Sequence, residues 1–263
     1  MTTDAYWQQQ SADTPLFPDI LWSRPETKQG AGKLLIVGGN SFGFAAPGQA
    51  FVTATKAGIG VCRVLLPEAL RKTIGSHMAE ADFAPNNPSG SFSKNALEPL
   101  LTNAMWANAT LLAGELGRNS ETAVTLETFV KRYRGPLTVT RDATDYFLKT
   151  PSDVLDRPET MLVVSFEQLQ KLALHSHFEV PLLFSMGTAL TASWLHEFSL
   201  LHRALIVMSH DDQFFFAKEG RVVTQKNISD EKIWRVTSAS RATVFWLQNP
   251  AKAFESVVTS LTN

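Results

Sequence analysis

The chain has 263 residues, of which 44% are apolar, and its 24 basic and 25 acidic side chains leave it almost neutral. This balance excludes the basic surface expected of a protein that binds nucleic acid or an anionic membrane. Cys62 is the only cysteine, which excludes an internal disulfide and a cysteine-based metal site, and no apolar run approaches the ~20 residues of a membrane span.

The N-terminal sequence MTTDAYWQQQSADTP has no basic segment that leads into an apolar one. We therefore expect no secretory signal and a cytoplasmic protein. Residues 1–25 contain Trp7, Trp22 and Pro25, and we expect them to form a strap on the surface of a single domain that spans residues 1–263.

From Lys33 onward, short apolar runs alternate with longer segments of helical period. Most runs are apolar throughout, which is typical of strands covered on both faces. The alternation predicts an α/β fold with a mostly parallel central sheet and helices on both of its faces. The predicted strands are Leu34 to Val37, Val61 to Leu66, Thr110 to Ala113, Leu137 to Thr140, Met161 to Val164, Pro181 to Ser185 and Leu205 to Ser209. The predicted helices are 47–57, 67–79, 93–107, 119–133, 166–176 and 188–202.

The pattern changes after Ser209, where QFFFAKEGRVVTQ predicts two strands around a turn at Lys218 to Gly220. This C-terminal β-hairpin is followed by a polar connection, then by a helix from about Thr237 to Leu247. Pro250 begins a final helix.

The stretch KLLIVGGNSFG, residues 33–43, is a predicted strand that runs into a glycine-rich loop. It lacks the Gly-Lys-Ser/Thr of a Walker loop, and its glycines are spaced wrongly for a dinucleotide fingerprint. A helix that begins with Pro47 at its first position follows, and the positive end of this helix is a candidate site for an anion. A tight turn between strand and helix, without a ligand, is the alternative.

Residues 24–71 carry a denser pattern, with a Lys-Gly lead-in, an apolar strand, a Gly-Gly pair and a helix that ends in spaced glycines. This pattern resembles the start of the NAD(P)H-hydrate dehydratases, a branch of the ribokinase-like superfamily, with Asn40 in the place of a serine. The matching positions are Lys28, Gly32, Gly38, Gly39, Lys56, Gly58 and Gly60.

Two later stretches are similar to the same family. In ATLLAGELGRN, residues 109–119, the family's glycine-rich turn is retained except that Glu115 replaces a glycine or a proline. A carboxylate there adds bulk and repels phosphate. In GPLTVTRDATDYF, Asp142 and Ala143 match the second half of an Asp-Ala-Asp-Ala motif, and Thr140 stands in place of its first aspartate.

The resemblance fails at the family's Gly-Thr-Gly-Asp loop, whose glycines surround phosphates and whose aspartate is the catalytic base. The corresponding helix, RVTSASRATVFWLQ, contains no glycine and no acidic residue. Since loss of a general base typically costs ~10²- to 10⁴-fold in rate, the resemblance implies a dehydratase-like protein with weak or no activity. The first alternative is a pseudoenzyme that keeps the ribokinase-like fold for nucleotide binding or assembly, and the second is a divergent small-molecule kinase.

The resemblance also implies ligands and their sites. We expect ADP or ATP, with Mg²⁺, as cofactor, a small-molecule nucleotide as ligand, no metal site built by the protein alone, and a homo-oligomer. Residues implied in binding the hydrated dinucleotide are Gly38, Gly39, Asn40, Gly43, Gly114, Gly117 and Arg118. Residues implied near the nucleotide phosphates are Ser209, His210, Ser238, Ser240 and Arg241. The candidate substitute bases are Asp142, Asp211 and Asp212.

Two of these expectations have plain alternatives. Arg241, at the first turn of its helix, either clamps a phosphate together with Ser238 and Ser240, or is solvated while a serine caps the helix. Asp211 and Asp212 either hold Mg²⁺ at the carboxyl edge of the sheet or form the turn that opens the hairpin.

Overall fold

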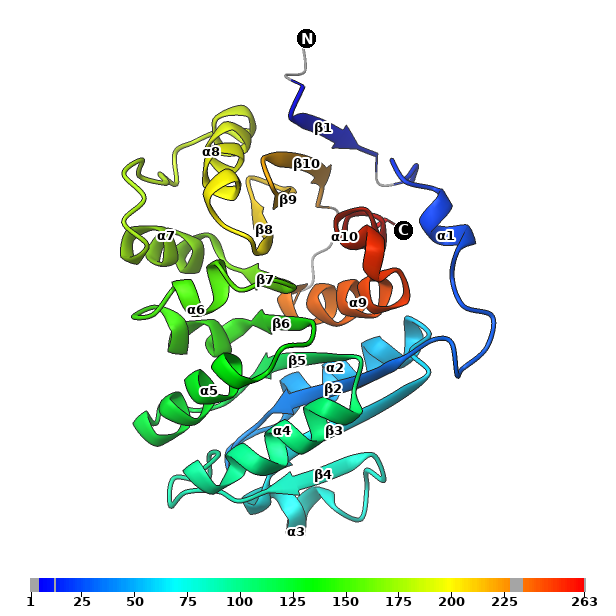
Figure 1. The fold of residues 1–263 in the computed structure, drawn as a ribbon, viewed down its shortest axis with the longest axis vertical. Coiled ribbons are helices and arrows are strands. Elements are labelled where there is room, and N and C mark those ends of the chain that lie inside the picture. Colours follow the sequence, from blue (N-terminus) through cyan, green and yellow to red (C-terminus); the bar gives the residue numbers. More distant parts are fainter. Residues whose placement is uncertain (1–4, 12, 228–233, 263) are drawn as a thin grey trace.

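The computed structural model describes residues 5–11, 13–227 and 234–262. Ten strands form one sheet in the order β1-β10-β9-β8-β7-β6-β5-β2-β3-β4 (Figure 1). All neighbouring pairs are parallel except those that β9 makes with β8 and β10. The strands are β1 Trp7–Gln10, β2 Lys33–Gly38, β3 Val61–Pro67, β4 Ala81–Ala84, β5 Ala109–Gly114, β6 Leu137–Thr140, β7 Thr160–Val164, β8 Leu205–His210, β9 Gln213–Lys218 and β10 Arg221–Lys226.

Helices cover both faces of this sheet, as the alternating pattern predicts. One face packs against α4 Leu97–Trp106, α5 Ser120–Arg132, α6 Ser152–Leu155, α7 Phe166–His175 and α8 Thr188–Leu201. The other packs against α2 Ala45–Lys56, α3 Arg71–Ile74, α9 Trp234–Gln248 and α10 Ala253–Ser260. A short helix α1, Asp19–Trp22, contacts α10. Single 3₁₀ turns are formed by Glu68–Leu70, Lys94–Ala96 and Pro250–Lys252, and a longer 3₁₀ helix by Arg141–Phe147.

Most strands are buried because they contribute to both hydrophobic cores. In β2, Leu34 and Ile36 point into one core and Leu35 and Val37 into the other, and all four side chains are fully buried. Successive side chains of a strand alternate between faces, so a strand covered twice must be apolar at every position. The predicted three-layer fold with its C-terminal hairpin is therefore confirmed.

The strand predicted at Pro181 to Ser185 is wrong, because no strand lies there. The neighbouring β8 is already paired on both sides, with β7 and β9, so another strand cannot pair with it. Side chains bind the carbonyl groups of this segment instead: Gln170 donates to the Leu182 oxygen at 2.6 Å, and the Trp194 indole donates to the Val180 oxygen at 2.9 Å.

The helix predicted at 67–79 is shorter than predicted, because only Glu68–Leu70 and Arg71–Ile74 are helical. A 3₁₀ turn and the single-turn helix α3 end before Gly75, and the chain then enters the edge strand β4. Glycine is a poor helix former, which favours an end at this point. The four residues of β4 are too few for a clear alternating pattern, and the sequence analysis missed the strand.

The N-terminal segment does more than cover the surface, since β1 extends the sheet by pairing with β10. The side chain of Gln10, 5% exposed, donates to the Gln225 side chain at 2.7 Å and to the Val258 oxygen at 3.1 Å. The first strand of the chain is thus joined to the last strand and to the C-terminal helix.

Smaller details of the predicted elements also changed. Pro47 is the third residue of α2 and not its first, a position that also lacks an N–H partner within the helix. Most of the polar connection before α9 falls on residues 228–233, which lie outside the described residues. Within the described chain, no helix is long and apolar enough to cross a membrane.

Candidate functional site

A cleft of about 1270 Å³ lies at the carboxyl ends of β2, β5, β6 and β7. The strand order reverses between β2 and β5, because β3 and β4 continue on one side and β6, β7 and β8 on the other. Ligands of open parallel sheets bind outside the carboxyl ends of the strands at such a switch point. The side chains that line this cleft include Asn40, Glu115, Arg118, Asp142, Gln168 and Arg235.

The turn after β5 is held by the carboxylate of Asp142. Its Oδ1 accepts a hydrogen bond from the Glu115 N–H at 2.7 Å, and its Oδ2 accepts one from the Leu116 N–H at 2.9 Å. Gly114 and Glu115 have φ angles of 98° and 58°, which suit glycine and strain a glutamate. The two charge-assisted bonds offset this strain. They engage both oxygens of Asp142, which argues against a role for it as a substitute base.

The Glu115 carboxylate lies at the N-terminus of α2. Its Oε2 accepts a hydrogen bond from the N–H of Ala46 at 3.0 Å, and its Oε1 lies 3.9 Å from a guanidinium nitrogen of Arg141. The sequence analysis proposed that the positive end of this helix attracts an anion. The chain itself supplies a carboxylate there.

The glycine-rich loop after β2 is a tight turn packed against β5. A Cβ on Gly38 would lie 2.4 Å from the Gly114 oxygen, and the Gly39 N–H donates to that same oxygen at 3.1 Å. Asn40 and Gly43 then form a two-way backbone bridge. The alternative of a tight turn that binds no ligand therefore accounts for the geometry of these glycines.

Three of the residues implied in dinucleotide binding do line the cleft, namely Asn40, Gly117 and Arg118. The Asn40 side-chain amide donates to the backbone carbonyl oxygen of Glu115 at 2.6 Å, and the Asn40 side-chain oxygen accepts a hydrogen bond from the Phe42 N–H at 2.7 Å. The Arg118 side chain is exposed at the rim.

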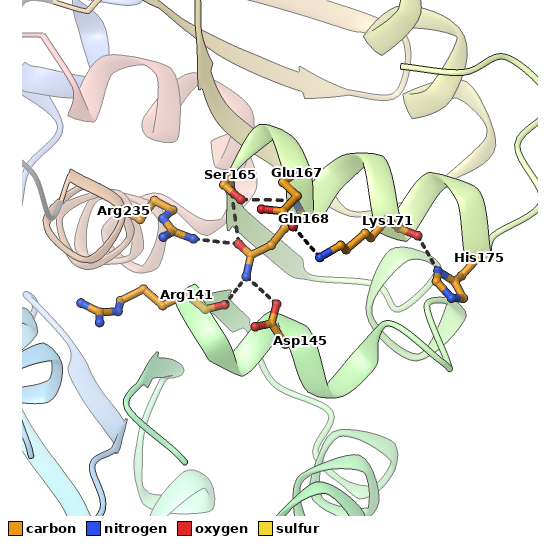
Figure 2. Close-up of polar contacts among 8 residues, drawn as sticks. All are labelled: Arg141, Asp145, Ser165, Glu167, Gln168, Lys171, His175 and Arg235. Atoms are coloured by element: carbon orange, nitrogen blue, oxygen red, sulfur yellow. Dashed lines mark hydrogen bonds and ion pairs between the residues drawn. The ribbon is translucent and has the colours of Figure 1, made fainter. Parts of the chain in front are cut away.

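Gln168 joins three segments around the cleft (Figure 2). Its amide nitrogen donates to the Arg141 oxygen at 2.7 Å and to the Asp145 carboxylate at 2.8 Å. Its amide oxygen accepts from the Arg235 guanidinium at 2.8 Å and from the Ser165 N–H at 3.2 Å. The loops after β6 and β7 and the beginning of α9 are thereby held in one arrangement.

Arg235 is the functional candidate that the sequence analysis missed. It projects from the first turn of the described part of α9 into the cleft, where burial and the charge of Arg141 lower its pKa. Ser165 and Gln168 form a complete capping box at the start of α7, and this Ser-x-x-Gln signal was readable in the sequence. Nothing local in the sequence indicated that Arg235 would meet it.

Two residues implied near nucleotide phosphates, Ser209 and His210, lie at the end of β8. The His210 ring is buried between Phe166 and Phe184, with Nε2 3.1 Å from the Met186 oxygen. Ser209 accepts a hydrogen bond from the Asn227 amide at 3.0 Å. Neither residue lines the cleft.

Asp211 and Asp212 have φ angles of 50° and 54° and form the two-residue turn between β8 and β9. Two consecutive left-handed residues are typical of a tight hairpin turn, which supports the turn alternative. No group of three or more His, Cys, Asp or Glu side chains within the described residues is placed to hold a metal ion.

The expected first-turn position of Arg241 is wrong, because the described part of α9 already begins at Trp234. Ser240 is fully buried and donates to the Ala50 oxygen at 2.6 Å, and Arg241 donates to the Thr262 oxygen at 2.9 Å. Ser238 and Arg241 line a second hollow instead of the cleft. The helix starts earlier than predicted because its first apolar residues precede Thr237.

No protein-family model and no curated protein sequence matches the chain. Several solved structures are similar to the chain in fold. A ribokinase-like superfamily protein from Enterococcus faecalis superposes with a TM-score of 0.73 at 15% identity, over 99% of this chain and 87% of that one. The chain has a ribokinase-like fold. This conclusion agrees with the fold that the glycine pattern implied.

Other ribokinase-like structures have known activities. The ADP/ATP-dependent NAD(P)H-hydrate dehydratase of Bacillus subtilis, co-crystallised with ATP and Mg²⁺, gives a TM-score of 0.62 at 14% identity, over 94% of this chain and 86% of that one. The pyridoxal kinase of Staphylococcus aureus, in complex with AMP-PCP and pyridoxal, gives 0.53 at 11%, over 87% and 84%. At these identities the likeness is one of fold, and function has to be argued from the cleft.

Proposed function

We propose that this ribokinase-like protein binds a nucleoside phosphate in the cleft and dehydrates hydrated NADH or NADPH weakly or not at all. The observation that carries the proposal is Arg235. The described start of α9 presents a guanidinium to the cleft, and there is no acidic residue in its first turn. An arginine stays protonated at every physiological pH, so it attracts phosphate and cannot serve as a general base.

The cations of the cleft support binding. Burial and the charge of Arg141 lower the pKa of Arg235, and a bound phosphate between the two guanidinium groups would relieve their repulsion. Arginine guanidinium groups bind phosphate oxygens in a bidentate way, with several charge-assisted hydrogen bonds. Arg118, Lys149 and Lys171 add positive charge around the same cleft.

Four of the five carboxylates that line the cleft are already engaged, which argues against efficient catalysis. Asp142 is engaged by two backbone N–H groups, Asp145 by Gln168, Glu115 by the start of α2, and Glu167 by Lys171 at 2.5 Å. A base needs an oxygen that is free to accept the substrate proton. Asp142 has both oxygens occupied, so it would have to break a hydrogen bond first. Glu127, which also lines the cleft, forms no hydrogen bond or ion pair with a described residue and is the carboxylate left for a weak activity.

The expected cofactors fit to different degrees. Arg141 and Arg235 suit the phosphates of ADP or ATP. No cluster of metal-ligating side chains exists among the described residues, so Mg²⁺ would be held chiefly by the nucleotide's own phosphate oxygens, as it often is in proteins. We also retain the expectation of a homo-oligomer, which light scattering on the purified protein tests.

The two alternative functions share the fold and differ in the reaction that the protein catalyses. A pseudoenzyme would bind ADP without any turnover of hydrated NADPH. A divergent kinase would transfer the ATP phosphate to an alcohol such as pyridoxal, but this reaction also benefits from a base, which the cleft supplies poorly. Assays of both reactions with one protein preparation separate the three functions.

Thermal unfolding with ADP is the first test. At an ADP concentration ~100 times its dissociation constant, the free energy of unfolding should rise by about 2.7 kcal/mol. The Arg235→Gln variant should lose most of this gain. Arg132→Gln is a matched control, because Arg132 is exposed, pairs only loosely with Glu98 at 3.8 Å, and lies away from the cleft. The absence of any shift at saturating ADP would refute the proposal, and rapid dehydration of hydrated NADPH would refute the proposed loss of activity.

A further inference from the structure

A second hollow of about 550 Å³ lies between α2, α9, the segment before β2 and the end of α10. We call it the α2–α9 groove. It shares no lining residue with the cleft, and the hydrogen bond between Ser240 and the Ala50 oxygen joins its two helices. The groove is therefore a separate feature on the helix layer formed by α2, α9 and α10.

Three cations line the groove, and no carboxylate does among its described residues. Arg24 comes from the N-terminal segment, Lys56 from the last turn of α2, and Arg241 from the middle of α9. Neither arginine forms an ion pair with a described residue. Arg24 donates to the Ala57 oxygen and to the Gln248 side chain at 3.4 Å, and Arg241 donates to the Thr262 oxygen.

Both guanidinium groups are partly removed from water. The central carbon of Arg24 lies 4.6 Å from the centroid of the buried Phe245 ring, and that of Arg241 lies 5.9 Å from the same centroid. Burial lowers the pKa of both groups, and the charge of Arg24 lowers the pKa of Arg241 further. Two like charges held beside one ring, without a neutralising partner among the described residues, raise the free energy of the folded state.

A bound anion would remove this cost. We propose that the α2–α9 groove binds the phosphate group of a small molecule, with Arg24, Lys56 and Arg241 as its cationic ligands. The volume lies within the range of small-molecule sites, and arginine is the side chain best suited to phosphate. The half-buried Trp234 at the groove offers an apolar surface to a planar group on the same ligand. The inference does not depend on the ligand of the cleft.

Calorimetric titration of the full chain with phenyl phosphate and with inorganic phosphate tests this site. Lys56→Gln is the safest variant, since Lys56 is exposed and makes no hydrogen bond or ion pair with a described residue. It should weaken phenyl phosphate binding about threefold, as loss of one exposed charge does. Arg24→Gln should weaken phenyl phosphate binding at least about tenfold, because the phosphate loses its hydrogen bond with the partly buried, charged Arg24 guanidinium. Raising the salt concentration should weaken binding in the unmodified protein.

Two further variants locate the binding. Arg132→Gln, a matched surface arginine, should leave the affinity for phenyl phosphate unchanged, and Arg235→Gln should not abolish binding, because the groove shares no lining residue with the cleft. Tighter binding of phenyl phosphate than of inorganic phosphate would identify an organic phosphate as the ligand class, and equal binding would identify free phosphate. The proposal is overturned if neither probe binds, if Lys56→Gln and Arg24→Gln bind as the unmodified protein does, or if Arg235→Gln abolishes binding.

Discussion

Replacement of Asp142 by alanine should destabilise the protein more than replacement of any exposed carboxylate. Asp142 accepts hydrogen bonds from the N–H groups of Glu115 and Leu116, at 2.7 and 2.9 Å, in a turn where Glu115 has a φ of 58°. A hydrogen bond to a charged group contributes about 1.5–3 kcal/mol. Since the site is half-buried, the lower value applies to each bond, and the expected loss is about 3 kcal/mol.

Equilibrium urea unfolding measures this loss directly, and the melting temperature should fall by about 6–12 °C, at about 2–4 °C per kcal/mol for a chain of this size. Asp142→Asn should lose roughly half as much, because its amide oxygen still accepts one bond while its NH₂ group faces a donor. Asp82→Ala is the matched control, since Asp82 is half-exposed and forms only a 3.9 Å ion pair with Arg63.

The reasoning is refuted if Asp142→Ala melts within 1 °C of the unmodified protein, on the scale of about 2–4 °C per kcal/mol. It is equally refuted if Asp142→Ala and Asp82→Ala lose the same free energy, because the loss would then come from charge and not from the two backbone bonds.

Three other substitutions test different parts of the structure. Glu115→Gly removes the carboxylate from the start of α2 and should strengthen ADP binding about tenfold by removing like-charge repulsion; an unchanged dissociation constant contradicts this. Arg157→Met leaves the carbonyl groups of Tyr133 and Gly135 without the donor they have now and should cost about 3 kcal/mol in urea unfolding. Burial raises the pKa of Cys62 from 9.0 to about 12. The protonated thiol's contribution to the free energy of unfolding is therefore complete below pH 9 and is lost as the pH rises toward 12. Relative to Cys62→Val, the protein should lose about 1.4 kcal/mol of this free energy at pH 10, and parallel pH profiles of the two proteins would contradict the prediction.

The fold was predictable because two strong signals agreed. Runs such as Leu34 to Val37 are apolar at every position, which only a doubly covered strand requires. Gly38 is needed where β2 and β5 approach closely, and Gly114 where the turn after β5 packs against Asp142. The segment at Pro181 to Ser185 has the same apolar character, yet it is no strand, because strand pairing depends on the free edges of the sheet and not on local composition.

The candidate site was only partly predictable. Asn40 and Arg118 follow predicted strands directly, so a carboxyl-edge position could be inferred for them. Arg235 lies more than sixty residues from its partner Gln168, and the contact depends on how α9 crosses the sheet edge. The position of Arg241 was mispredicted for a similar reason. The described part of α9 begins three residues before the predicted start, so Arg241 is not in its first turn and lines another surface.

The pairing of β1 with β10 has a consequence for how the protein is made. A ribosome synthesises Trp7–Gln10 more than two hundred residues before the partner strand Arg221–Lys226. The N-terminal strand therefore waits through almost all of translation, and it can dock only after release of most of the chain. Until then β1 has no strand to pair with, and an unpaired strand invites association with other chains. A strand that is synthesised long before its partner is therefore among the last to fold.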